Sequence, residues 1–165
     1  MPSVSTATVR HLRRANGYIE LRMLNEASDE LEAIEGEDRL SVEVMAVRSD
    51  LYRQAKQWDL LAAVARELAR RSPDYEKGWI DWANALREMD KIREAKAVLL
   101  EAQPIHGKTS AVLHFNLSRY QCLLGEMEDA RERVRTACQI DAEFKTKALD
   151  EPDLSALWGD VEATK

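Results

Sequence analysis

A spacing of 34 or 35 residues recurs along most of this chain of 165 residues. The pattern is clearest between Asp74 and Pro104, where apolar residues recur at three- and four-residue steps on both sides of the polar break Met89-Asp90-Lys91. Such steps predict two helices joined by a tight turn, each with an apolar stripe that faces the other. Because the pattern returns at a fixed period, the chain is predicted to consist of repeated helical hairpins.

Four columns of small or apolar residues define the repeat, the first column lying twelve residues before the second and the others four and seven residues after it. In chain order they are Ala15, Ser49, Ala83 and Ser118; Ala27, Leu61, Ala95 and Ala130; Leu31, Ala65, Leu99 and Val134; and Ile34, Leu68, Ala102 and Ala137. Small side chains in the first column allow the two helices of one hairpin to approach closely. The larger columns are expected to fill the space between hairpins.

These columns resemble the tetratricopeptide repeat (TPR) family, whose hairpin carries an aromatic and a small residue in its first helix and alanines around a large apolar residue in its second. The matching residues are Trp79, Ala83, Ala95, Leu99 and Ala102 in the central repeat, Leu117, Ser118, Gly125, Ala130, Val134 and Ala137 in the last, and Tyr52, Ala65 and Pro73 in the second. Leu61 stands where the family prefers alanine, and Arg22 stands where the turn often has glycine. The resemblance covers residues 8 to 144.

The resemblance implies an all-α fold, a right-handed α-solenoid of about four TPR helical hairpins with a C-terminal capping helix pair. The expected single domain, residues 1–165, contains hairpins at approximately 8–41, 42–75, 76–110 and 111–144, followed by a cap at 145–165. In and just before that cap, short helices are expected over 143–149 and from Pro152 to Trp158. Their apolar side chains, Phe144, Leu149, Leu154, Leu157 and Trp158, would cover the end of the last repeat.

Two boundaries follow from local residue preferences. Gly36 is expected to end the second helix as a left-handed closing residue. Pro104 favours a connection over residues 103–108, in which His106 would lie, with Thr109 or Ser110 capping the next helix.

Composition and charge restrict the classes of function. Six glycines, four prolines and 33% charged residues suit a soluble, mostly helical protein. The formal net charge of -6 argues against nucleic acid as the main partner, because phosphate contacts need clustered cations. No apolar run is long enough to span a bilayer, and the opening residues lack the hydrophobic block of a secretory signal. We therefore expect a cytoplasmic protein without membrane association.

The sequence contains no glycine-rich phosphate loop, paired-cysteine metal motif or nucleophile elbow. No catalytic residue, cofactor or metal site is therefore expected, and the protein is predicted not to be an enzyme. Cys122 and Cys138 are interpreted as packing residues of the last hairpin. His11 and His114 occupy the column of Trp79 and are interpreted in the same way.

In members of the family that this chain resembles, the first helices of successive hairpins line a concave groove that accepts an extended peptide or a partner helix. The repeat register places Glu43, Ala46 and Asp50 there in the second hairpin, Lys77, Ile80, Asn84 and Arg87 in the third, and Phe115, Asn116 and Arg119 in the fourth. Ile80 and Phe115 would supply an apolar anchor. The arginines and asparagines would bond a peptide backbone or acidic side chains. The predicted partner-binding residues are those of the third and fourth hairpins.

The leading hypothesis is a non-catalytic adaptor or scaffold that binds a protein partner in this groove. A chaperone for an exported client protein is a second hypothesis. A nucleic-acid-associated regulator that uses Arg10, Arg13 and Arg14 is a third. Some members of the family that this chain resembles grip a terminal carboxylate of a partner with a clamp of cationic and amide side chains. Asp50 and Ala46 stand where this clamp would need such groups, so no strong preference for a partner's free C-terminus is expected. Self-association through the first hairpin is a further possibility.

Overall fold

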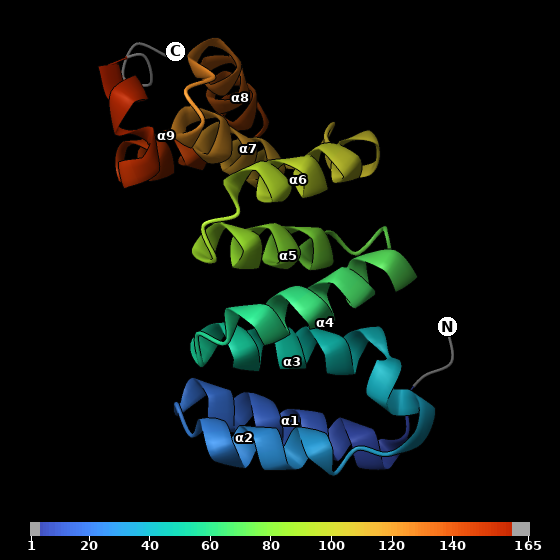
Figure 1. Ribbon diagram of the computed structural model, residues 1–165. Coiled ribbons are helices and arrows are strands. Elements are labelled where there is room, and N and C mark those ends of the chain that lie inside the picture. The colour runs from blue at the N-terminus through green and yellow to red at the C-terminus, as the bar shows by residue number, and fades with distance from the viewer. Residues whose placement is uncertain (1–3, 160–165) are drawn as a thin grey trace. The chain divides into compact units, whose positions relative to one another are not determined.

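The computed structural model describes residues 4–159, which contain helices and no strand (Figure 1). The α-helices are α1 (Thr6–Glu20), α2 (Leu24–Glu32), α3 (Val42–Gln54), α4 (Trp58–Arg71), α5 (Glu76–Glu88), α6 (Ile92–His106), α7 (Ala111–Leu123), α8 (Met127–Ile140) and α9 (Glu143–Leu149), and two 3-10 helices are η1 (Gly36–Leu40) and η2 (Pro152–Leu157). The predicted all-α class is confirmed. The chain divides after Ala85 into two compact units, which are described separately. The predicted single domain with its four hairpin ranges stays a prediction.

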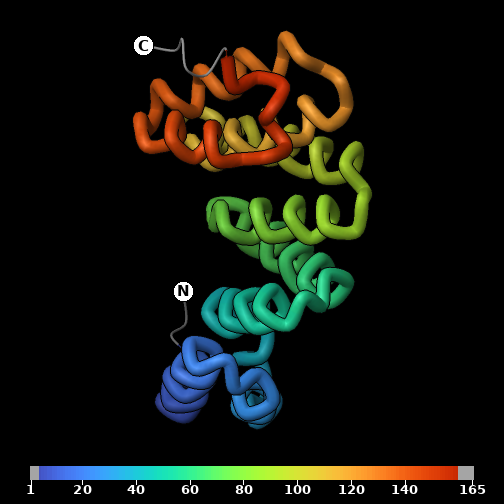
Figure 2. The backbone as a smooth tube through the Cα atoms, turned by 90° about the vertical axis from the view of Figure 1, so that its left-hand side faces the viewer, coloured from blue at the N-terminus to red at the C-terminus, as the bar shows by residue number. Residues whose placement is uncertain are grey.

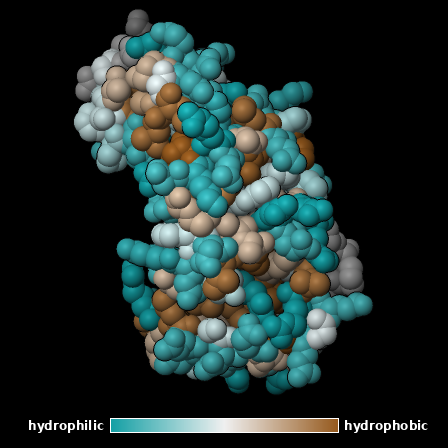
Figure 3. Space-filling view, in the orientation of Figure 1, coloured by the Kyte–Doolittle hydropathy of each residue, from teal (hydrophilic) through white to brown (hydrophobic). Residues whose placement is uncertain are grey.

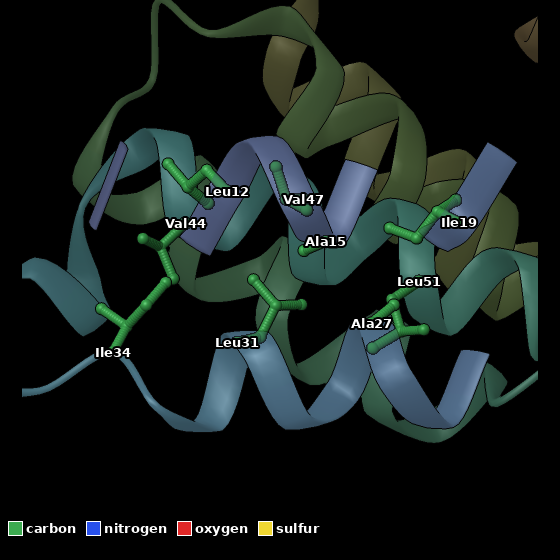
Figure 4. Packing of buried hydrophobic residues seen from close by; sticks show 9 residues of the cluster. All are labelled: Leu12, Ala15, Ile19, Ala27, Leu31, Ile34, Val44, Val47 and Leu51. Atoms are coloured by element: carbon green, nitrogen blue, oxygen red, sulfur yellow. The ribbon is translucent and has the colours of Figure 1, made fainter. Parts of the chain in front are cut away.

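In the first unit, α1 packs against α2 and α3, and α3 packs against α4. Nine buried apolar side chains of α1, α2, α3 and the residues between them meet in one cluster, with Leu31 of α2 near its middle (Figure 4). Ser5 caps α1, and the carboxylate of Asp38 in η1 accepts hydrogen bonds from the Ser5 backbone at 2.9 Å and from the Thr8 hydroxyl at 2.6 Å. These bonds fix η1 against the start of α1.

In the second unit, α7 is the central helix, in contact with α6, α8, α9 and η2. Ser110, one of the two predicted caps, accepts a hydrogen bond from the Leu113 backbone at 2.9 Å and so begins α7. The chain then returns along α8, and the last two short helices lie beside α7 and α8 (Figures 1 and 2). Leu154 and Leu157 of η2 are 0% and 1% exposed. The described part of the predicted cap, residues 145–159, therefore packs against α7 and α8, although its second helix is a 3-10 helix; residues 160–165 of that prediction lie outside the described residues.

The repeat columns identify the buried residues correctly. All sixteen column positions are at most 3% exposed, including Ser49 and Ser118 at 0%. The Ser49 hydroxyl donates to the Met45 carbonyl oxygen at 3.0 Å, and the Ser118 hydroxyl donates to that of Phe115 at 2.6 Å. These local bonds satisfy the hydroxyls, so serine can replace alanine at a close contact. Hydrophilic side chains dominate the face drawn in Figure 3.

Each first helix of a predicted hairpin ends in the same hydrogen-bonded turn. In each turn, a backbone N–H donates to the carbonyl oxygen five residues earlier. These bonds run from Met23 to Tyr18 at 2.8 Å, and from Gln57 to Tyr52, Lys91 to Leu86 and Glu126 to Gln121 at 2.9 Å. The residue before each donor has a positive φ, namely Arg22 at 59°, Lys56 at 55°, Asp90 at 61° and Gly125 at 79°. This is a Schellman motif, which prefers glycine at the left-handed position. Of these four turns, the last alone has one there.

Two local expectations were wrong in detail. Gly36 does adopt a positive φ of 67°, but it begins η1, because α2 already ends at Glu32. The connection predicted over residues 103–108 is instead the last turn of α6, with His106 as its final residue. Pro104 lies inside the last turn of α6 with its side chain exposed, and Gly107 closes the helix by donating to the Gln103 carbonyl oxygen at 2.8 Å. A Cβ at Gly107 would lie 2.6 Å from that oxygen.

The turn geometry makes a stability prediction. Lys56→Gly should raise the free energy of unfolding by about 0.5–1 kcal/mol, because a left-handed backbone costs a residue with a Cβ about 1–2 kcal/mol and the greater freedom of glycine in the unfolded chain offsets only part of that. Gly125→Ala should lower the free energy of unfolding by about 1 kcal/mol for the same reason. Urea denaturation followed by circular dichroism measures both. Lys56→Ala is the control, and an equal gain from it would contradict the explanation.

Candidate partner-binding surfaces

The predicted partner-binding residues fall on α5 and α7, and the structure separates them into two groups. Lys77, Ile80 and Asn84 belong to the first unit. The second unit contains Arg87, Phe115, Asn116 and Arg119. Lys77, Ile80 and Asn84 follow one another at three- and four-residue steps, so their side chains share a face of α5. Arg87 lies near the end of α5, whereas Phe115, Asn116 and Arg119 belong to α7. Nothing tests whether either group binds a partner, and both remain predictions.

A compact charge network surrounds Lys77 in the first unit. The Asp81 carboxylate, whose side chain is 5% exposed, accepts from Lys77 Nζ at 2.6 Å and from Arg53 Nη2 at 2.6 Å. Asp50 joins the same cations, its Oδ1 lying 3.0 Å from Lys77 Nζ and 2.9 Å from Arg53 Nη1. Two cations thus face two anions. Because each Asp81 oxygen is held by a different cation, the network fixes α5 relative to α3.

Ile80 and Asn84 lie one helical turn apart on α5, and both are half-buried. The tryptophans beside them have another role. Trp79 is 5% exposed and donates from Nε1 to the Pro73 carbonyl oxygen at 2.9 Å, and its ring stacks on that of Trp82 with 6.2 Å between centroids. Ile80 and Asn84 are therefore presented by a helix whose tryptophans stabilise it by packing.

In the second unit, Arg87 and Arg119 converge on one carboxylate. Asp153 of η2 accepts from Arg87 Nη2 through both oxygens, at 2.7 and 2.9 Å, and from Arg119 Nη2 at 3.1 Å. The Arg119 and Asp153 side chains are 15% and 12% exposed. Burial disfavours the charged form of Arg87, but the hydrogen bonds and charge interactions with Asp153 and Glu88 together outweigh that effect and raise the pKa of Arg87. The two guanidinium groups thus form a charged, partly desolvated carboxylate site.

The remaining contacts extend this site on both sides. Arg119 Nη1 donates to Asn116 Oδ1 at 3.0 Å, which orients the guanidinium group, and Arg119 Nε lies 3.1 Å from Glu151 Oε2. Glu151 in turn accepts from the Asp153 backbone N–H at 3.2 Å. Asn116 itself is 4% exposed. Its amide therefore positions Arg119 and is shielded from direct contact with an incoming chain.

An apolar contact region lies next to the carboxylate site. Leu154 and Leu157 belong to a buried cluster with Ala130, Val134 and Ala148. The Phe115 ring is half-buried and meets the ring of Phe144 edge to face, with 5.3 Å between centroids. Phe115, which the register predicted as an anchor for a partner, thus packs against the C-terminal part of its own chain.

The structure therefore brings Arg87, Phe115, Asn116 and Arg119 together, as the repeat register indicated. Sequence reasoning missed Glu151 and Asp153, whose carboxylates occupy the predicted surface. Asp153 lies 34 residues beyond Arg119 and 66 beyond Arg87 in the chain, so the contact leaves no local signal. The one hint is the order of residues, because two acidic groups directly precede the apolar pair Leu154 and Leu157 of the predicted cap.

His114 is buried, as its column predicted, and it also joins a polar network. Its Nε2 lies 2.7 Å from the Gly107 carbonyl oxygen, and its Nδ1 lies 3.1 Å from Arg133 Nη1. Arg133 also donates to Gln103 Oε1 at 3.0 Å. Burial lowers the pKa of His114, and the nearby Arg133 charge lowers it further, although the bond to Gly107 acts in the opposite direction. His114 thus joins α7 to the end of α6 in its neutral form.

The histidine, cysteine and acidic side chains of the described residues are the ones that could form a metal site or a reactive thiol. Among residues 4–159, no three His, Cys, Asp or Glu side chains gather as metal ligands would. Cys122 and Cys138 are free, and burial raises the pKa of both thiols, which disfavours the reactive thiolate. No helix in that range is both long and apolar enough to cross a membrane. In the first hairpin, the predicted nucleic-acid contact Arg14 lies 3.5 Å from Glu30, which also pairs with His11.

Comparison with solved structures identifies the fold. A thermophilic TPR protein from Thermus thermophilus matches 93% of this chain and 82% of its own at a TM-score of 0.70 and 18% identity. A MamA structure designated AMB-1 matches 98% of this chain and all of its own chain, with a TM-score of 0.65 and 12% identity. A MamA structure designated MSR-1 matches 84% of this chain and 99% of its own, with a TM-score of 0.53 and 16% identity. No protein-family model and no curated protein matches the sequence. The chain therefore has the tetratricopeptide repeat fold.

The arginine–aspartate contact can be tested by a double-mutant cycle on Arg119→Ala and Asp153→Ala. We expect a coupling free energy of about 1–3 kcal/mol, because removal of either partner leaves a poorly solvated charge. Urea denaturation of the four proteins measures it. The pair Arg71 and Glu67 is the control, since both side chains are more than 40% exposed, and its coupling should stay below about 0.5 kcal/mol. Equal coupling in the two cycles would contradict a special role for the carboxylate site.

The His114 network predicts a pH dependence. Because folding lowers the pKa of His114 below its usual value of 6.5, the unfolded chain takes up this proton first as the pH falls. The contribution of neutral His114 is therefore complete above pH 6.5 and is lost progressively below it. Denaturation series between pH 8 and pH 5 should show a steeper loss of stability for the parent than for His114→Gln. Parallel curves would show that the imidazole does not titrate as the structure implies.

Proposed function

We propose that this protein is a non-catalytic adaptor that binds a protein partner through the exposed faces of its first helices. One observation carries the proposal: α7 already holds a peptide segment, because Arg87 and Arg119 bind the Asp153 carboxylate while Leu154 is buried beside them. A surface that combines oriented guanidinium groups with an apolar contact has the chemistry of a peptide-binding site. The tetratricopeptide repeat fold supports this proposal.

The two groups of predicted residues have different roles in the proposal. In the first unit, Ile80 is the apolar contact and Asn84 bonds the partner backbone, while Lys77 can turn toward a partner carboxylate because Arg53 also neutralises Asp81. In the second unit, Arg87 and Arg119 supply the charge. No cofactor takes part, and the cytoplasm is the predicted compartment.

Site-specific photo-crosslinking in the source cells tests the proposal. A photoreactive phenylalanine analogue replaces Ile80 on α5 in one protein and Leu60 on α4 in another. Leu60 is 42% exposed and lies on a second helix of the same unit, so it is the matched control. We expect crosslinked proteins from position 80 that are absent from position 60, and mass spectrometry identifies them. The same bands from both positions, or none from position 80, would contradict binding through the first-helix face.

A further inference from the structure

The C-terminal segment of this chain carries a chemical pattern that fits the surface on which it lies. The pattern is Glu151-Pro152-Asp153-Leu154, followed three residues later by Leu157. Two carboxylates meet the guanidinium groups, and both leucines are buried, whereas Pro152, Ser155 and Ala156 between them are exposed. The ion pairs of the segment with the surface thus come from two acidic side chains, and its buried apolar groups are two leucines.

We propose that the Arg87–Arg119 surface recognises partner segments of this same pattern, acidic residues followed by a leucine pair, and that the C-terminal segment competes with them for it. This inference rests on the function proposed above and names the chemistry of the partner. The charge is complementary, because the surface presents two guanidinium groups within 3.1 Å of carboxylate oxygens. A basic or uncharged partner segment would leave those groups partly desolvated and unpaired.

The location of the competing segment determines how the site works. The segment is tethered to α8 through α9 (Figure 2), so its local concentration at α7 is high whatever the protein concentration. A free partner binds only the fraction of molecules whose segment has left the surface, and its apparent affinity is reduced by that fraction. Substitutions that weaken the binding of the segment without changing the surface should therefore strengthen partner binding.

The test uses full-length proteins and a fluorescent synthetic peptide that copies residues 150–159 of the chain. Leu157→Asp places a carboxylate at a position that is 1% exposed and should release the segment. This variant should bind the peptide at least about tenfold more tightly than the parent does, and Leu157→Asp combined with Arg119→Glu should lose that gain. A peptide with Asp153→Asn should bind Leu157→Asp about tenfold more weakly than the original peptide does. Equal binding to all three proteins, with their helical content unchanged, would overturn the proposal.

A second measurement does not depend on a destabilising substitution. Hydrogen exchange of the parent is followed with and without excess peptide, and the peptide should raise the exchange of residues 151–158 without affecting α1 or α2. Unchanged exchange at saturating peptide would show that the segment is a fixed part of the core and would overturn the competition. A parent dimer that becomes monomeric with Leu157→Asp would also overturn it, because the segment would then join two copies of the chain.

The crosslinking experiment separates this inference from the function on which it depends. A protein captured at position 80, together with equal binding of the peptide by the parent and by Leu157→Asp, would leave the adaptor function intact and would reject the acidic-leucine pattern. A captured protein that contains the pattern, and whose binding to the parent the peptide reduces, would support both.

Discussion

The close approach of paired helices at small, buried side chains is the constraint on which the other features of this fold depend. Ala15, Ser49, Ala83 and Ser118 are fully buried, as are Ala27 and Ala95. A larger side chain at the alanines and serines would push the helices apart and open voids beside the larger columns. Each first helix thereby keeps a fixed rotation, which determines the side chains that point away from the packed interior. The candidate surfaces consist of those remaining side chains.

These surfaces are held in place by charge clusters, each of which joins two or more helices. In the first unit Asp81 holds two cations, and in the second unit Asp153 holds two guanidinium groups. Such buried or half-buried pairs contribute little net stability, since the cost of removing charges from water offsets much of their attraction. Their larger effect is on geometry, because a carboxylate between two cations restricts both side chains. Side chains that are already restricted lose less conformational entropy when a partner binds.

The sequence predicted the fold well because its information is local and repeated. The columns from Ala27 to Ala130 marked buried positions, and Ser110, one of the two predicted caps, begins α7. Errors arose where one residue preference competed with packing: Pro104 was expected to end a helix, yet its exposed ring leaves the buried Ala102 face of α6 intact. The covering of Arg87 and Arg119 could not be predicted, because it depends on a contact between distant parts of the chain. Repeat register places a residue on a helix face but does not reveal which other segment lies against it.

The position of the C-terminal segment also has a consequence during protein synthesis. Thirty-four residues separate Arg119 from Asp153, and a ribosome adds about 5–20 residues per second. For a few seconds after α7 has been made, Arg87 and Arg119 therefore exist without the acidic segment that later covers them. A partner already present at the ribosome would meet an uncovered surface in that interval. The order in which this chain is translated thus gives a nascent molecule access to contacts that a finished molecule makes with itself.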